Sequence, residues 1–503
     1  MNIGLGNGEE IMKSVNTKAV TIALFIATFL TAIEGTIVST AMPIVASELQ
    51  GIGLMNWVFS IYLLTSAVTI PIFGKLSDLF GRKNIFIYGT IVFLIGSTLC
   101  GLSQSMEQLI IFRAIQGIGA GAIMPVTMTI IGDIYPFEKR AKMLGIMGMA
   151  WGIAGVVGPL IGGFFVDQMS WHWIFYMNIP FGIASIGMVG WYLKENIPME
   201  KKSIDYLGAI VFSAAVLLFL YTLQQVGSHQ WSTFEIIIGF FFSFLLFTVF
   251  VWIELKAEEP MIPIKILSLP AISVGNAVAF LASVVLIGTM VYIPMWAQGV
   301  LGKGATESGL MLAPMSLTWM VGSFIGGRML LLKGERFTIA SGMSIIALAV
   351  LWMFSFTLST PSLHFYLLSA VIGLGFGTVI TITSVTVQSA VDFSKRGVAT
   401  ASNTFFRTIG QSIGSAFIGI FFNIIVSAHS NVDPNQFNEL INSKETSALS
   451  EGTIHTLKDA LVYGIHYVFL VLLFIAIIGM LTTVLLPKKN KDRNDHNETA
   501  NVV

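Results

Sequence analysis

Long apolar segments, separated by short polar ones, make up most of this chain. Fourteen of these segments are long enough to cross a membrane as helices, because an α-helix rises 1.5 Å per residue and the hydrocarbon core of a bilayer is about 30 Å thick. The pattern predicts an all-α integral membrane protein with 14 transmembrane helices. The segments cover approximately residues 18–40, 55–74, 84–103, 107–132, 143–166, 172–193, 204–224, 234–254, 271–299, 308–331, 338–357, 363–388, 398–427 and 460–486.

The positively charged residues predict how these segments are oriented. With a cytoplasmic N-terminus, the cytoplasmic segments hold 22 of the 27 lysines and arginines and the outer loops hold three. The remaining two, Arg113 and Arg407, lie within apolar segments. Because cytoplasmic loops of membrane proteins carry an excess of lysine and arginine, we expect both termini inside the cell.

The composition supports a membrane protein and argues against other classes. Residues are 55% hydrophobic and 11% charged, whereas a soluble domain has about 25% charged residues. The formal net charge is zero, so nothing favours a nucleic-acid partner. One cysteine, Cys100, cannot form a disulfide within the chain. The polar N-terminal segment lacks the pattern of a cleaved signal peptide, so we expect the first apolar segment to direct insertion.

The sequence contains no recognisable catalytic set. It has no Gly-rich, lysine-containing phosphate loop of the ATPase type, so we expect no ATP hydrolysis by this chain. The histidines are few and scattered, and none is paired at the spacing of metal ligands. We therefore expect a protein that is not an enzyme and that needs neither a metal nor a cofactor.

Two charged residues lie at membrane depth near the outer ends of their segments. Glu34 lies nine residues before Pro43, where we expect the first helix to end, and so about 13 Å inside that end. Arg113 lies about 9 Å inside the outer end of the fourth segment. A charge at this depth is costly unless it is paired, so Glu34 and Arg113 are expected to pair if their helices adjoin. The pair has two interpretations, a proton-coupling site or a purely structural ion pair.

The loop Gly74–Lys83 has the spacing of a known signature. Glycines allow a tight turn there, and Asp78 is suited to cap a helix or to pair with a cation. The loop closely resembles the signature loop of the major facilitator superfamily, with Ser77 and Leu79 as departures. That resemblance implies that the loop braces two halves of the protein during a conformational cycle. The gating residues it implies are Gly74, Asp78, Gly81 and Arg82.

Further motifs resemble the 14-helix drug:proton antiporters of that superfamily. They include Glu34–Pro43 in the first segment, residues 171–182 and residues 407–414. The Arg113 motif in the fourth segment resembles that of the superfamily as a whole, in which the arginine is associated with proton transfer. The fifth segment is rich in glycine, which by itself indicates only close helix packing. Its end resembles the antiporter motif of drug exporters, which implies further conformational gating residues, namely Gly158, Pro159, Gly162 and Gly163.

The resemblance implies a major facilitator fold and a function. Expected are a cytoplasmic N-terminus (1–17), a six-helix half (18–193), an inserted helix pair (204–254), a second six-helix half (271–486, with an outer loop at 428–459) and a cytoplasmic tail (487–503). The implied function is proton-coupled export of small amphipathic compounds, such as dyes and fluoroquinolone-type antimicrobials, by a monomer in the bacterial plasma membrane. Only the proton gradient supplies energy. The alternative is a dedicated transporter of one endogenous solute, such as a lipid intermediate, a siderophore or an osmolyte.

A substrate cavity is expected between the two halves. Methionine and aromatic side chains suit promiscuous binding. Arg407 lies about 14 Å deep, with no acidic residue at mid-depth in the second half, which argues against an obligately dicationic substrate. It has four open interpretations: a contact for an anionic or zwitterionic substrate, a partner for Glu34, a donor to a backbone carbonyl, or a packing role. The candidate cavity residues are Gln116, Met147, Trp151, Trp296, Trp319, Phe405, Arg407 and Gln411.

Overall fold

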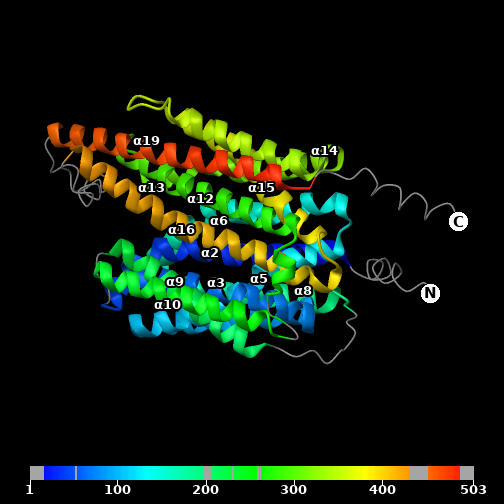
Figure 1. Ribbon diagram of the computed structural model, residues 1–503. Helices are drawn as coiled ribbons and strands as arrows, with labels where there is room; N and C mark the ends of the chain where they lie inside the picture. The colour runs from blue at the N-terminus through cyan, green and yellow to red at the C-terminus, as the bar shows by residue number, and fades with distance from the viewer. Residues whose placement is uncertain are drawn as a thin grey trace, which may run out of the picture.

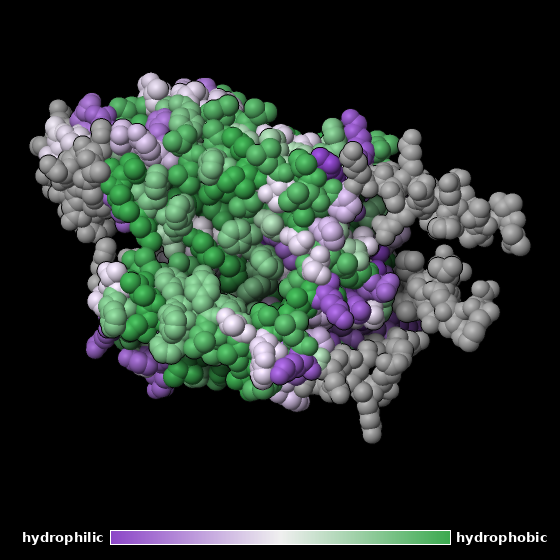
Figure 2. Space-filling model, in the orientation of Figure 1, coloured by the Kyte–Doolittle hydropathy of each residue, from purple (hydrophilic) through white to green (hydrophobic). Residues whose placement is uncertain are grey.

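The computed structural model describes residues 16–50, 54–195, 205–228, 231–257, 260, 262–430 and 451–487. These residues form helices and connecting turns, with no strand among them. Thirteen of the described helices are long and apolar enough to cross a membrane. Figure 2 shows hydrophobic side chains over much of the surface of the long helices. The prediction of an all-α membrane protein is confirmed. Most of the predicted N-terminal segment, outer loop and C-terminal tail lies outside the described residues.

The first helices form what we call the N-terminal bundle. Its helix α2 begins at Asn16, whose side chain accepts a hydrogen bond from the Ala19 N–H at 3.2 Å. Helices α4 and α5 approach closely because glycine removes the side chain between them; a Cβ on Gly96 would lie 2.4 Å from the Gln116 nitrogen. The helices are α2 (Thr17–Glu48), α3 (Met55–Phe80), α4 (Arg82–Gly101), α5 (Met106–Ile134), α6 (Phe137–Gln168), α7 (Trp173–Tyr176) and α8 (Asn178–Tyr192).

The first helix does not end where the sequence predicts. Helix α2 continues through Pro43 to Glu48. A proline removes one backbone hydrogen bond from a helix, and here the neighbouring bonds carry the helix past it. The apolar stretch suited to the membrane still ends at Met42, so the depth worked out for Glu34 stands.

The last helices form what we call the C-terminal bundle, which packs beside the N-terminal one (Figure 1). Its helices are α12 (Pro270–Gly299), α13 (Ala305–Leu310), α14 (Ala313–Met353), α15 (Ser362–Ser389), η2 (Phe393–Lys395), α16 (Arg396–Ser430), α19 (Glu451–Thr482) and η3 (Thr483–Leu485), and the short helix α11 (Ile264–Leu267) precedes them.

Helix α14 is interrupted near its middle. Gly334 has φ 81° and ψ 176°, a conformation that is strained for any residue with a side chain. The uninterrupted length of α14 would be about 60 Å, twice the thickness of the hydrocarbon core, so the helix reverses direction at Gly334 (Figure 1). Counting its two arms separately raises the thirteen candidate spans to fourteen. The number fourteen stays a prediction, which the break at Gly334 supports.

Helices α9 (Tyr206–Ser228) and α10 (Thr233–Glu254) lie between the two bundles in sequence. Helix α10 begins with a capping box, in which Ser232 and Glu235 satisfy each other's backbone N–H groups. The α9 side chains Phe212 and Val216 pack in one cluster with Leu64 of α3 and with Phe405 of α16. The pair therefore covers a seam where the two bundles meet.

The described chain begins and ends at the same end of the helices (Figure 1), which we call the termini end. We call the opposite end the far end. An even number of crossings places both ends of a chain on one side, so this arrangement agrees with fourteen spans better than with thirteen.

Candidate functional site

A buried ion pair joins α2 to α5 inside the N-terminal bundle. The Nη1 atom of Arg113 lies 2.7 Å from Oε1 of Glu34, and the two side chains are 1% and 0% exposed. The adjoining helices that the pairing requires are thus present. Their assignment to proton coupling stays a prediction, since an ion pair of this geometry is equally able to hold helices together.

Neutral groups complete the surroundings of this pair. Asn178 of α8 donates from Nδ2 to Oε2 of Glu34 at 2.8 Å. Arg113 also donates to Oε1 of Gln116 at 2.8 Å and to the carbonyl of Val58 at 3.2 Å, and its guanidinium lies 4.1 Å from the centre of the Tyr62 ring. Sequence reasoning did not select Asn178 or Tyr62 as site residues, although Asn178 lies within the motif at residues 171–182.

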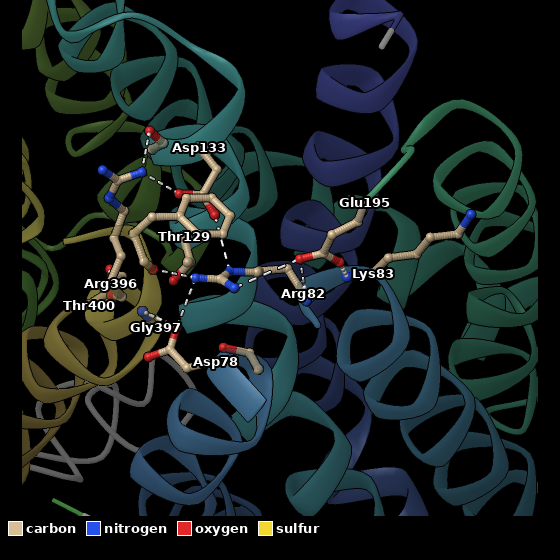
Figure 3. Close-up of polar contacts among 12 residues, drawn as sticks. Asp78, Arg82, Lys83, Thr129, Asp133, Glu195, Arg396, Gly397 and Thr400 are labelled. Atoms are coloured by element: carbon tan, nitrogen blue, oxygen red, sulfur yellow. Dashed lines mark hydrogen bonds and ion pairs between the residues drawn. The ribbon is translucent and has the colours of Figure 1, made fainter. Parts of the chain in front are cut away.

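A second polar cluster joins the two bundles at the termini end (Figure 3). Asp78, in the last turn of α3, accepts hydrogen bonds from the backbone N–H groups of Gly397 at 2.9 Å and Val398 at 2.8 Å. These residues open α16, where free N–H groups and the helix dipole favour a carboxylate. Arg82, at the start of α4, donates to Oδ1 of Asp78 at 2.9 Å and to the Phe393 carbonyl at 2.6 Å.

Three residues that sequence reasoning missed extend this cluster. The Oδ2 atom of Asp133, at the end of α5, lies 3.1 Å from Nε of Arg82. Its Oδ1 atom accepts a hydrogen bond from Arg396 of the C-terminal bundle. Glu195 follows α8 and accepts from the backbone N–H groups of Arg82 at 3.0 Å and Lys83 at 2.9 Å. Burial raises the pKa of Glu195 above its ordinary value, and those N–H groups oppose the rise. An acid beside the termini end of a segment was the available signal.

Hydrogen bonds across the bundles gather at this end. Among the described residues six of them join the bundles there: the two to Asp78, one from Arg82, two from Arg396 and one from Gln388 to the Met128 carbonyl. The two bundles are thus fastened together at the termini end in this conformation.

Glycines in the predicted gating loop serve this closure. Gly81 has φ 95° between α3 and α4, which allows the turn that brings Asp78 and Arg82 together. A Cβ on Gly74 would lie 2.2 Å from the Cβ of Ala401 on α16, so the absence of a side chain permits the two bundles to touch. Their gating role stays a prediction.

The glycines predicted to gate at the end of α6 differ in their surroundings. A Cβ on Gly158 would lie 2.1 Å from Oγ1 of Thr36 on α2, and one on Gly162 would lie 3.1 Å from another α2 side chain. At Gly163 no atom lies within 4 Å. The side chain of Pro159 lies outside the described residues. Close approach of α6 to α2 therefore requires Gly158 and does not require Gly163.

A cavity lies between the bundles, bordered by α5 and α6 on one side and by α12, α14, α15 and α16 on the other. Four of the eight candidate cavity residues line it: Trp151, Trp319, Arg407 and Gln411. The complete lining is Met124, Met128, Leu144, Gly148, Trp151, Gly152, Leu286, Met290, Met315, Ser316, Trp319, Ile380, Thr381, Ser384, Arg407 and Gln411.

Two aromatic candidates are placed elsewhere by packing. Trp296 is fully buried within the C-terminal bundle, stacked on Phe469 of α19 at 6.3 Å between ring centres. Phe405 points to the seam covered by α9, where its ring centre lies 5.4 Å from that of Phe212. The sequence marks both as apolar helix positions but does not show which face of the helix meets the cavity.

The other two candidates lie inside the N-terminal bundle. Gln116 is fully buried and accepts its hydrogen bond from Arg113. Met147 is also fully buried, with its sulfur 4.0 Å from Oγ1 of Thr28 on α2. Neither side chain is among those that line the cavity.

Comparison with known proteins agrees with this architecture. The family model described as Major Facilitator Superfamily matches residues 24–415. The chain is 32% identical to the "Multidrug transporter protein MdtP" of Bacillus subtilis, with 98% of each chain covered. It is 33% identical to the "Multidrug resistance protein 3" of the same species, with 95% of this chain and 96% of that protein covered.

A solved structure shows the same fold. The human organic anion transporter MFSD10 (TETRAN) superimposes with a TM-score of 0.59 at 14% sequence identity, covering 92% of this chain and 99% of that one. With a family model over most of its length and relatives of full length above 30% identity, the chain belongs to the major facilitator superfamily, and it is a membrane transporter of that type.

Proposed function

We propose that this transporter is a proton-coupled antiporter that exports small amphipathic compounds, including dyes and fluoroquinolone-type antimicrobials, by alternating access. The observation that carries the proposal is the fully buried carboxylate of Glu34, held by Arg113 inside the N-terminal bundle. A cavity walled by methionine and tryptophan supports amphipathic substrates. The names of the two Bacillus relatives support the export of several compounds.

A proton on Glu34 is expected to act through Arg113. The neutral acid no longer balances the guanidinium, which then keeps only Gln116 and the Val58 carbonyl as acceptors. Breaking a buried ion pair costs about 3–5 kcal/mol, enough to change a conformational equilibrium more than a hundredfold. Proton binding and the opening of the protein are then coupled, as a transporter driven by a proton gradient requires.

We propose further that the termini end faces the cytoplasm of a bacterial cell. The lysine and arginine bias supports this orientation. The cluster around Asp78 and Arg82 then closes the cytoplasmic side, and the conformation described here faces outward. The proposed division is a six-helix half at 18–193, an inserted pair at 204–254 and a second half at 271–486, whose rocking exposes the cavity to either side.

The test is efflux of ethidium and norfloxacin from energised cells or vesicles, for wild type and for Glu34→Gln, with and without an uncoupler. We expect efflux to stop with the uncoupler and in Glu34→Gln. The matched control is Glu48→Gln, which makes the same change on the same helix at a carboxylate that accepts from the Trp171 indole and has no ion-pair partner among the described residues. It should retain efflux.

Each other outcome removes a different part of the proposal. Efflux in Glu34→Gln that still depends on the gradient would take the coupling role from Glu34. Efflux that survives the uncoupler would exclude proton antiport. If folded wild-type protein exports neither compound, multidrug export is refuted and a dedicated transporter of one endogenous solute takes its place.

A further inference from the structure

Arg407 is a cation in the cavity that no other part of the described chain balances. It lies on α16, eleven residues after Arg396 and so about 16 Å from the termini end of that helix. Its side chain lines the cavity, and its buried Nε atom has no hydrogen-bond partner. Within the described chain its guanidinium makes no hydrogen bond and no ion pair. A guanidinium cannot lose its charge in a protein, so an acceptor must come from elsewhere.

The cavity wall offers no counter-charge. None of the described residues that line it is an aspartate or a glutamate. The acid predicted as a possible partner, Glu34, is already held by Arg113 and Asn178. A buried charge without a partner is unfavourable, and a ligand that supplies an anionic group removes that cost on binding.

The polar side chains that line the cavity come from one wall, whereas apolar side chains line both walls. The polar ones, Ser316, Thr381, Ser384, Arg407 and Gln411, all come from the C-terminal bundle. The N-terminal bundle contributes methionine, leucine, glycine and tryptophan to the lining. A ligand with an anionic group at one end, which meets the polar side chains, and an apolar body at the other, which meets the remaining lining, matches this arrangement.

The two bundles also provide fixed surfaces for such a ligand. Gln411 follows Arg407 by one helical turn, lines the cavity, and makes no hydrogen bond within the described chain, so it offers a second donor on the same face. Trp319 is held flat against Phe376, with ring centres 6.1 Å apart, and its indole packs on Gly148 of the other bundle. The apolar body of the ligand then lies along Trp319 and the methionines.

We propose that the cavity recognises amphipathic compounds that carry a carboxylate, anionic or zwitterionic, and that Arg407 binds the carboxylate with Gln411 beside it. The fork of a guanidinium matches a carboxylate with two parallel hydrogen bonds. Cations without an acid group are disfavoured by the same charge. The proposal rests on the proposed export of amphipathic compounds, whose substrate class it narrows.

The test measures equilibrium binding to purified protein, which needs no proton gradient. The probes are nalidixic acid, which is an anion at neutral pH, its ethyl ester, which is neutral, and ethidium, which is a cation. For wild type we expect the acid to bind about ten to a hundred times more tightly than the ester, the range of one charge-assisted bidentate contact. Ethidium should bind more weakly than the acid.

Two variants locate the effect. Arg407→Gln should abolish the preference for the acid and leave ester binding close to wild type, because the guanidinium has no structural partner to lose. Arg407→Lys should keep part of the preference, since an ammonium retains charge but not the fork. The control, Arg328→Gln, removes a cation that lies against Phe324 away from the cavity lining, and should leave the preference unchanged.

The outcomes separate this inference from the function on which it rests. Equal binding of acid and ester to wild type, or an acid preference that survives in Arg407→Gln, overturns the role of Arg407 while export of amphipathic compounds stands. Tighter binding of ethidium than of the acid overturns the carboxylate class. Failure of all three probes to bind to folded protein refutes both the inference and the proposed multidrug cavity.

Discussion

Asp78 holds the two bundles together through its charge as well as its shape. The substitution Asp78→Asn keeps the shape and removes the charge. In the wild type, Oδ1 accepts from Arg82 and from the Gly397 N–H, and Oδ2 accepts from the Val398 N–H. An asparagine offers one oxygen and one NH2 group, so one of the two backbone N–H groups of α16 then faces a donor.

The magnitude follows from these three bonds. One bond is lost and leaves a buried N–H unsatisfied, which costs about 1–3 kcal/mol. The other bond to α16 changes from charge-assisted to neutral and loses about 1 kcal/mol, whereas the bond from Arg82 keeps its charged donor and lies within the N-terminal bundle. The closed termini end is therefore weakened by about 2–4 kcal/mol, which changes the ratio of closed to open protein by about thirtyfold or more.

The assay is a distance measurement across the termini end by pulsed electron spin resonance. Spin labels on Asn84→Cys and Ser394→Cys place one label in each bundle on exposed residues, and Cys100→Ala removes the one native cysteine. We expect one short distance for the unsubstituted cluster and a second, longer distance in Asp78→Asn. The melting temperature should change little, because both bundles keep their own cores.

The control is Glu195→Gln. Glu195 also accepts two backbone N–H bonds at a helix start, but its partners, Arg82 and Lys83, lie in its own bundle. It should lower stability without producing the long distance. If Asp78→Asn leaves the short distance unchanged, or if Glu195→Gln opens the end equally, then the bonds from Asp78 to α16 do not control closure.

Three further outcomes are expected. Gly158→Ala should impair transport or lower stability by about 1–3 kcal/mol through overpacking against α2, whereas Gly163→Ala should match wild type in efflux and melting temperature, since open space surrounds it. Gly334→Ala should lower the melting temperature by the equivalent of about 1–2 kcal/mol, because its φ of 81° is strained for alanine; an unchanged value would argue against the break in α14. Trp296→Ala should cost about 3–5 kcal/mol of stability. Trp151 lines the cavity and is 47% exposed, so Trp151→Ala should alter ligand affinity at nearly unchanged stability. The reverse result would show that Trp151 is the structural residue and Trp296 the ligand contact.

The sequence was sufficient for features that depend on one helix at a time. Apolar length located the spans, including the two arms that meet at Gly334. Depth along the helix axis also matched Glu34 with Arg113, because a rise of 1.5 Å per residue converts position into depth. The ion pair needed no knowledge of packing beyond the adjacency of two helices.

Features that depend on the rotation of a helix were beyond the sequence. Trp296 and Trp319 are both tryptophans in apolar helices, yet one is buried within its bundle and the other lines the cavity. The hydrophobic pattern of a membrane helix is nearly uniform around its axis, so it does not show which face meets lipid, protein or cavity. Asp133 and Arg396 were missed for a related reason: each is an ordinary loop-proximal charge until α5 and α16 are placed together.

The sign of the charge at Arg407 constrains how a proton could drive export. For a cationic substrate, an ionised Glu34 attracts the ligand and a proton weakens that attraction, so charge alone exchanges one for the other. For a carboxylate at Arg407 the sign is reversed, because a proton on Glu34 makes the buried charge of the protein more positive and strengthens the attraction. The proton then cannot expel the substrate by charge. It must act through the conformational equilibrium, by weakening the Glu34–Arg113 pair and the state that this pair stabilises. An anion exporter built on these residues therefore depends on coupling between the bundles, and we expect that coupling to involve the end where Asp78 and Arg82 join the bundles.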